Sequence, residues 1–216
     1  MTLERAIVAV VASFGLLSAS AAPARAQGLA LDGQVGYFSL SSASKSANAV
    51  FGSAGGATYG GSLSYGFDSG FYLEGGARYF SKTGQRVFLA GPSGPVFPLG
   101  FPLKMRLVPI FFNVGYRFGG RGPIVPYLAV GGSVTSFHEE STVAGLTTME
   151  DSTKGGGQVL AGLEFGKGHL RLAGEAAYAF VPNTIGIAGV SKVYGEKDLG
   201  GFSVVGKLIF GFSSRN

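Results

Sequence analysis

The stretch Phe202-Ser-Val-Val-Gly-Lys-Leu-Ile-Phe-Gly-Phe212 decides the fold of this chain. Its even-numbered positions are all apolar or glycine, whereas Ser203 and Lys207 stand at odd-numbered positions. Alternation with a period of two residues indicates a β-strand with two different faces. The apolar face begins and ends with phenylalanine, four residues before the sequence ends. A barrel that pairs its last strand with its first inside a membrane accounts for such a strand.

Seven earlier stretches alternate in the same way, and the connections between all eight are in turn long and short. The stretches are residues 29–40, 57–68, 71–79, 104–118, 124–137, 157–165 and 169–180. The long connections are residues 41–56, 83–102, 138–156 and 181–201, and the short ones are 68–70, 119–123 and 166–168. This pattern predicts an all-β protein: an eight-stranded antiparallel up-and-down transmembrane β-barrel with long extracellular loops and short periplasmic turns.

Aromatic residues near both ends of the apolar faces support the same prediction. Two girdles of this kind are typical of strands whose ends lie at the two interfaces of a membrane. On the side of the short turns the girdle contains Phe67, Phe71, Phe118, Phe165 and Phe212, and on the loop side it contains Tyr37, Tyr59, Tyr79, Tyr178 and Phe202.

The N-terminal residues predict export. An apolar run from Ala6 to Ala22 follows a short charged start, and Pro23-Ala-Arg-Ala26 offers the small residues of a cleavage site. We therefore expect residues 1–26 to be a signal peptide and residues 27–216 to form the barrel domain in the cell outer membrane. No later segment has the 18 consecutive apolar residues of a membrane-spanning helix.

The composition excludes several classes of function. The sequence contains no cysteine, so disulfide and thiol chemistry are absent. The net charge is only +5 and no run of lysine or arginine accompanies it, which argues against a nucleic-acid partner. The two histidines, His138 and His169, fall near opposite ends of the predicted barrel and predict no metal site. The glycine clusters have no phosphate-loop signature, and we expect no cofactor.

The inward faces of the predicted strands carry charged residues of both signs. The lumen of an eight-stranded barrel is just wide enough to be filled by side chains, and buried charges need partners. We therefore predict a polar network in the lumen that has a structural role, with a proton or ion path as the alternative. Glu74 and Arg78 share one strand, and Glu164 and Arg171 flank a turn. The predicted network contains Asp32, Glu74, Arg78, Asn113, Arg117, Glu164, Arg171, Glu175 and Lys207.

Two segments at or beyond the ends of the predicted strands invite a functional interpretation. The stretch Ser136-Phe-His-Glu-Glu140 has the residue types of a hydrolase site, but histidine and glutamate in a polar loop are also ordinary surface residues. The segment Val87–Pro102 is unusually apolar and rich in proline. It is expected to cap the barrel, with contact to lipid or to a protein partner as alternatives.

The chain resembles the small outer-membrane β-barrels of the OmpA/OmpX type, the outer membrane protein beta-barrel domain group. The resemblance covers residues 27–216. It rests on Arg106–Phe118 (RLVPIFFNVGYRF), on Pro126–Gly132 (PYLAVGG) and on the last strand. It implies that Phe210 and Phe212 form a C-terminal signal for the barrel-assembly machinery, although four residues follow Phe212 here. It also implies contact with outer-membrane lipid and lipopolysaccharide.

The resemblance implies a non-enzymatic structural or surface-interaction role, and it does not identify the surface partner. Three alternatives stay open at this point: a narrow pore, a hydrolase that modifies lipid A and depends on His138, and a soluble periplasmic lipocalin-like binder. The last alternative would reverse the two faces of every strand, since its apolar side chains would fill the core.

Overall fold

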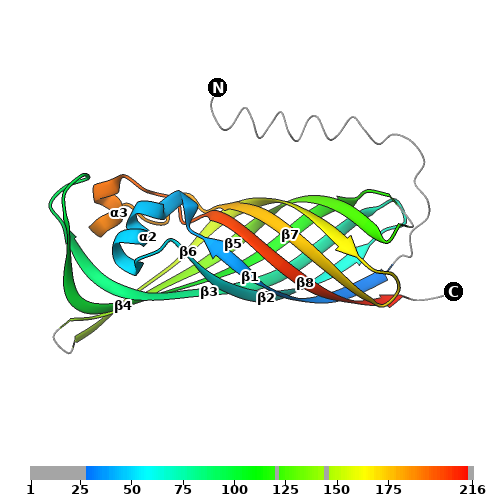
Figure 1. Cartoon of the computed structure of the whole chain (residues 1–216), viewed down its shortest axis with the longest axis horizontal. Helices are drawn as coiled ribbons and strands as arrows, with labels where there is room; N and C mark the ends of the chain where they lie inside the picture. The colour runs from blue at the N-terminus through cyan, green and yellow to red at the C-terminus, as the bar shows by residue number, and fades with distance from the viewer. Residues whose placement is uncertain (1–27, 120–121, 144–145, 214–216) are drawn as a thin grey trace, which may run out of the picture.

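A computed structural model describes residues 28–119, 122–143 and 146–213. The predicted signal peptide lies outside these residues. The described chain forms one closed antiparallel barrel in which each strand pairs with the next and β8 pairs with β1 (Figure 1). The strands are β1 Gly28–Ser39, β2 Gly55–Gly66, β3 Phe71–Leu89, β4 Val96–Arg117, β5 Ile124–Val143, β6 Leu146–Phe165, β7 Leu170–Phe180 and β8 Gly201–Ser213. The predicted fold class and strand number are confirmed.

The C-terminal strand closes the barrel as the sequence predicts. Leu29 lies opposite Phe212 and Tyr37 lies opposite Val204, so β1 and β8 pair along their whole lengths. Closure leaves no strand edge unpaired in this part of the molecule, which a lipid environment requires because it offers no water to unpaired backbone groups.

The two faces of the wall have the polarity of a transmembrane barrel. Apolar side chains point outward, as Val35 does with 68 % of its surface exposed and Phe212 with 59 %. Charged side chains such as Lys207 and Glu74 are buried inside. A soluble barrel would have the opposite arrangement, so the alternative of a lipocalin-like binder is wrong. No helix in the described residues is long and apolar enough to cross a bilayer.

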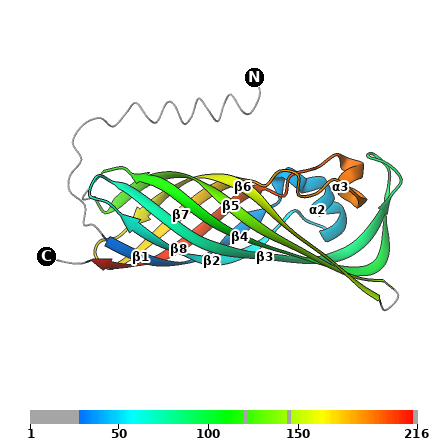
Figure 2. The same cartoon turned by 180° about the vertical axis from the view of Figure 1, so that it is seen from behind.

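Two of the predicted loops are mostly strand. β3 and β4 have 19 and 22 residues, and β5 and β6 have 20 each, so the segments 83–102 and 138–156 largely continue the sheet. Both views show β3–β6 extending past the barrel (Figure 2). Outside the barrel neither face needs to be apolar, and the alternation that marks a strand in the sequence is lost there. The proline and glycine residues of these segments therefore led to the prediction of loops that are longer than those in the structure.

The other two long connections contain short helices. The first holds a 3₁₀-helix, Ser41–Ala43, and α2, Ser44–Phe51; the last holds α3, Gly189–Tyr194. The carboxylate of Glu196, after α3, accepts bonds from the backbone N–H groups of Lys45 and Ser46 at 3.0 and 2.9 Å. This contact joins the two connections over one end of the barrel, where they form a cap.

An apolar cluster lies under this cap. It contains Leu40, Ala43, Ala47, Phe80, Met105, Leu107, Phe137, Val181 and Leu199. The segment Val87–Pro102, which the sequence led us to expect as the cap, contributes none of these residues. Its Phe88 and Phe97 are 58 % and 48 % exposed. The capping interpretation of that segment is therefore wrong, because the helical connections already fill the barrel mouth.

The close packing of β1 against β8 yields a prediction with an internal control. A Cβ on Gly36 would lie 2.1 Å from the carbonyl oxygen of Val204 and 2.6 Å from the Cα of Val205, whereas a Cβ on Gly33 meets nothing within 4 Å. We expect Gly36→Ala to destabilise the barrel by about 1–3 kcal/mol. Gly33→Ala should stay within about 0.5 kcal/mol of the wild type. Urea unfolding of the refolded protein, followed by gel mobility, measures both. Equal midpoints would contradict the β1–β8 packing.

Candidate functional site

The middle of the lumen is filled by polar side chains from every strand of the barrel. We call this set the central network. It contains Asp32 and Gln34 of β1, Ser62 of β2, Glu74 and Arg78 of β3, Asn113 of β4, Tyr127 of β5, Gln158 of β6, Glu175 of β7 and Lys207 of β8. All ten residues are buried.

Two cations hold the network together across the lumen. The Nζ of Lys207 lies 2.7 Å from Glu74 Oε1 and 2.6 Å from Glu175 Oε2. The Nη2 of Arg78 lies 2.6 Å from Glu175 Oε1. β3 and β7 are four strands apart in the closed ring of eight, so the Arg78–Glu175 pair joins opposite walls. The side chain of Glu175 is 0 % exposed and that of Lys207 is 4 % exposed, so water does not compete for these bonds.

Neutral side chains complete the hydrogen bonding of Glu74. Ser62 donates its hydroxyl to Glu74 Oε1 at 2.7 Å, and Asn113 donates its amide to Glu74 Oε2 at 2.9 Å. Gln158 in turn donates to Asn113 Oδ1 at 2.8 Å. Through these bonds β2, β4 and β6 are connected to one carboxylate, as a buried charge requires.

Asp32 is held by neutral donors alone. Gln34 donates to Asp32 Oδ1 at 2.8 Å, and the Ser62 hydroxyl, whose single proton lies between Asp32 and Glu74, also contacts Asp32 Oδ2. The carbonyl oxygen of Gln34 accepts from Arg78 Nε at 2.7 Å, which links this carboxylate to the cation on β3. The central network thus contains three carboxylates but only two cations.

A second ionic group lies nearer the end with the short turns. Arg117 Nε is 3.2 Å from Glu164 Oε2, and Arg171 Nη1 donates to the other oxygen of the same carboxylate. The guanidinium of Arg117 also lies 4.3 Å from the centroid of the Tyr72 ring, a distance that suits a cation–π contact. This group carries two cations and one carboxylate, so it balances the excess negative charge of the central network.

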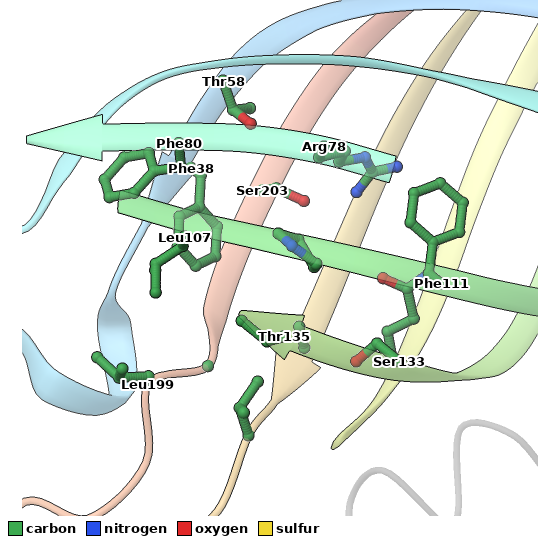
Figure 3. A pocket seen from close by; sticks show the side chains of 15 residues that line it. Phe38, Thr58, Arg78, Phe80, Leu107, Phe111, Ser133, Thr135, Leu199 and Ser203 are labelled. Carbon is green, nitrogen blue, oxygen red and sulfur yellow. The ribbon is translucent and has the colours of Figure 1, made fainter. Parts of the chain in front are cut away.

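A small cavity separates the central network from the apolar cluster (Figure 3). Its volume is about 50 Å³. Arg78 and Gln158 of the network reach its lining, as do Thr58, Ser133, Thr135 and Ser203; apolar lining residues are Phe38, Phe80, Leu107, Pro109, Phe111, Ala179, Val181 and Leu199. We call the part of the lumen between the network and the cap the upper lumen. It is polar on the side of the network and apolar on the side of the cap.

Solved structures with the same architecture are known, although the sequences differ widely. A major outer membrane protein from Thermus thermophilus has a TM-score of 0.58 and 12 % identity, with 87 % of this chain and 100 % of that chain covered. The fold is that of the small outer-membrane β-barrels.

Two further matches are more distant in structure. The N-terminal β-barrel domain of Pseudomonas aeruginosa OprF has a TM-score of 0.49, with 13 % identity over 87 % of this chain and 100 % of that chain. Neisserial surface protein A has a TM-score of 0.48, with 16 % identity over 85 % of this chain and 96 % of that chain. No protein-family model matches the chain, and no curated protein matches it.

The nine polar residues predicted for the barrel lumen fall into the two groups described above. Asp32, Glu74, Arg78, Asn113, Glu175 and Lys207 lie in the central network, and Arg117, Glu164 and Arg171 lie in the group near the turns. Sequence reasoning left out four members of the network: Gln34, Ser62, Tyr127 and Gln158. All four stand on the same period-two face as the charged residues, so a list of every polar inward position would have found them.

The rim of the barrel holds the residues that suggested a hydrolase. His138 Nδ1 lies 2.5 Å from Asp151 Oδ1 of the neighbouring strand. No hydrogen bond joins Ser136 to His138 in the residues that the structure describes. On the opposite face, Glu139 stands directly across from Glu150. Burial raises the pKa of Glu139 and the facing Glu150 raises it further, whereas Arg86 lowers it. Within the described ranges, no three acidic or histidine side chains converge as metal ligands.

The double contact of Lys207 yields a second prediction. Lys207→Met leaves Glu74 and Glu175 buried with fewer partners, and breaking a buried ion pair on one side costs about 3–5 kcal/mol. We expect the urea midpoint to fall accordingly. The control variant is Lys104→Met, which replaces a half-buried lysine at the rim of the barrel. Its free energy of unfolding should differ from that of the wild type by less than about 0.5 kcal/mol.

A double variant separates lost charge pairing from lost packing. Glu74→Gln added to Lys207→Met removes one of the two carboxylates left behind, so part of the stability should return. A double variant no more stable than Lys207→Met alone would show that the lysine acts through its packing rather than through its charge.

Proposed function

We propose that this protein is a non-enzymatic barrel of the bacterial outer membrane, closed to ions, whose role is structural or lies in surface interaction. The observation that carries the proposal is the central network, to which all eight strands contribute and which crosses the lumen from wall to wall. Two further features, the apolar outer wall and the long hairpins at one end, support the location and the role.

The outer wall supports a location in the outer membrane. Its apolar side chains form a continuous band, and each of the eight strands is at least as long as the roughly 9–11 residues that cross a membrane. In bacterial barrels of this type the short turns face the periplasm and the long connections face outward. The cap and the extended hairpins then lie outside the cell. Contacts with lipid, lipopolysaccharide and the assembly machinery, the last through Phe210 and Phe212, belong to this proposal.

The closed lumen argues against a pore. An ion that crosses the middle of the barrel must separate Arg78 from Glu175 and displace Lys207 from two carboxylates. Between the central network and the capped end, the apolar cluster and the cap fill the barrel. On the other side of the central network, Glu164 holds both Arg117 and Arg171. Three successive barriers of different chemistry favour a structural lumen over a conducting one.

The extended hairpins support a role at the cell surface. β2 pairs with β3 only as far as Phe80, and β7 pairs with β6 only from Gly157, so β3–β6 continue as a sheet of four strands beyond the barrel. No charged residue occurs between Arg86 and Lys104, and the exposed rings of Phe88 and Phe97 lie together with centroids 6.4 Å apart. An exposed apolar patch of this kind is typical of an interaction surface.

The His138–Asp151 pair is the strongest feature in favour of an enzyme. A hydrolase of the serine type also needs its nucleophile within hydrogen-bond reach of the histidine. Ser136 makes no such bond in the described residues, and Asp151 is largely exposed. The pair is accounted for as a contact between two neighbouring strands outside the membrane.

Conductance measurements test whether the lumen is closed. We expect the wild-type protein to show no stable current in a planar bilayer. The double variant Arg78→Ala/Glu175→Ala removes the pair across the lumen without changing the net charge and should open a measurable conductance. Arg106→Ala/Glu140→Ala is the matched control, because that pair, at 3.9 Å, lies on the exposed rim. A wild type that conducts as well as the lumen variant would contradict the proposal.

Epitope tags test the location and the orientation. A tag inserted at Ser93, between β3 and β4, should be stained by antibody on intact cells, because the extended hairpin points away from the cell. A tag at Ser69, in the short turn between β2 and β3, should be stained only after the outer membrane is permeabilised. Staining of Ser69 on intact cells, or recovery of the protein in the soluble fraction, would overturn the topology or the location, respectively.

A further inference from the structure

The cavity of the upper lumen has two chemically different sides. Phe38, Phe80 and Leu107 line it toward the cap, together with Val181 and Leu199 of the last long connection. Thr135 is among its polar lining residues. A concave apolar site with a few placed polar groups is the usual form of a site for a small molecule.

Thr135 is the observation that points to a ligand. The residue is only 3 % exposed, and its Oγ1 has no hydrogen-bond partner in the part of the chain that the structure describes. A buried hydroxyl without a partner costs about 1–3 kcal/mol, so a guest that bonds to it recovers that free energy. The hydroxyl of Tyr72, elsewhere in the lumen, also lacks a partner, but among the described residues that line the cavity only Thr135 has a buried side-chain polar atom without one.

The charge of the central network selects the kind of head group. The network contains three carboxylates and two cations, and the cation nearest the cavity, Arg78, already binds Gln34 and Glu175. A carboxylate entering the cavity would have to compete with Glu175 for Arg78, the one charged residue among those that line it. A neutral hydroxyl or carbonyl group avoids this competition and can still bond to Thr135.

The roof of the cavity is a connection rather than a strand. Val181 and Leu199 meet through a backbone bond of 3.2 Å, and Asp198 Oδ1 accepts the N–H groups of Val181 and Gly200 at 2.9 and 2.5 Å. About 50 Å³ accommodates a head group and its first carbon atoms, since one water occupies about 30 Å³ of the liquid. A longer chain must displace Leu199 and lie against the apolar cluster.

We propose that the upper lumen binds a short neutral amphiphile, an alcohol or carbonyl compound, from the extracellular side. Its oxygen bonds to Thr135 and its chain packs between Phe80, Leu107 and the displaced Leu199. This proposal does not depend on the surface role inferred above, because a closed floor at the network and a binding pocket above it are compatible.

Methyl-detected NMR of the whole protein in micelles tests the proposal with 1-pentanol as the probe. The methyl signals of Thr135, Val181 and Leu199 should shift and saturate, whereas Val134 and Leu163 on the lipid-facing wall should shift linearly without saturation. Pentanoate should bind at least about tenfold more weakly, because of its charge. Thr135→Val keeps the shape of the side chain and should weaken pentanol binding about three- to tenfold, the equivalent of one hydrogen bond.

The control variant is Thr153→Val, whose threonine is exposed on the extension of β6 and should leave binding unchanged. Gel mobility establishes that each variant has folded. If Thr135→Val does not fold, the wild-type titration alone decides. Absence of saturation at Thr135 would mean that the cavity holds water only and would overturn the proposal. Equal binding by wild type and Thr135→Val, or tighter binding of pentanoate than of pentanol, would also overturn it.

Discussion

The burial of carboxylates inside the barrel is the constraint on which the rest of the structure depends. Glu74 and Glu175 have almost no access to solvent, and an unpaired charge in such a place would cost more than the folded state of a small domain provides. Lys207 must therefore reach both, and Arg78 must reach across the lumen to Glu175. These contacts tie β3, β7 and β8 to one another inside the barrel, beyond the neighbour-to-neighbour pairing of the sheet.

The glycines of the wall follow from the same constraint. A lumen that holds long polar side chains and two tyrosines has no room for side chains at every inward position. A Cβ on Gly131 would lie 2.1 Å from Asn113 Oδ1, and one on Gly162 would lie 2.4 Å from the hydroxyl of Tyr127. The high glycine content, which in another protein suggests a flexible linker, here leaves space for the network within a regular sheet.

The sequence predicts well where the membrane imposes a pattern, and poorly beyond that region. Within the barrel, one face must suit lipid and the other the lumen, so alternation identifies the strands, the faces and the charged inward residues. In the extensions of β3–β6, which begin beyond Phe80 of β3 and end at Gly157 of β6, the two faces of the sheet do not differ in this way. The sequence of these extensions therefore resembles that of loops. The partners inside the lumen are also hard to predict. Glu164 and Arg171, close in sequence across a turn, do pair, but Arg78 pairs with Glu175 on the opposite wall and not with Glu74 on its own strand.

The lumen is closed in two ways that differ in strength. The floor consists of side chains from paired strands, and it moves only if the barrel itself deforms. The roof consists of Val181, Leu199 and two short helices joined through Glu196, and it opens at the cost of local contacts alone. Local openings of small free energy are found in such connections and rarely in a closed sheet. A molecule that enters from the capped end therefore meets the roof, which can open locally, before it meets the floor, which cannot, so binding inside the barrel is confined to the half nearest the cap.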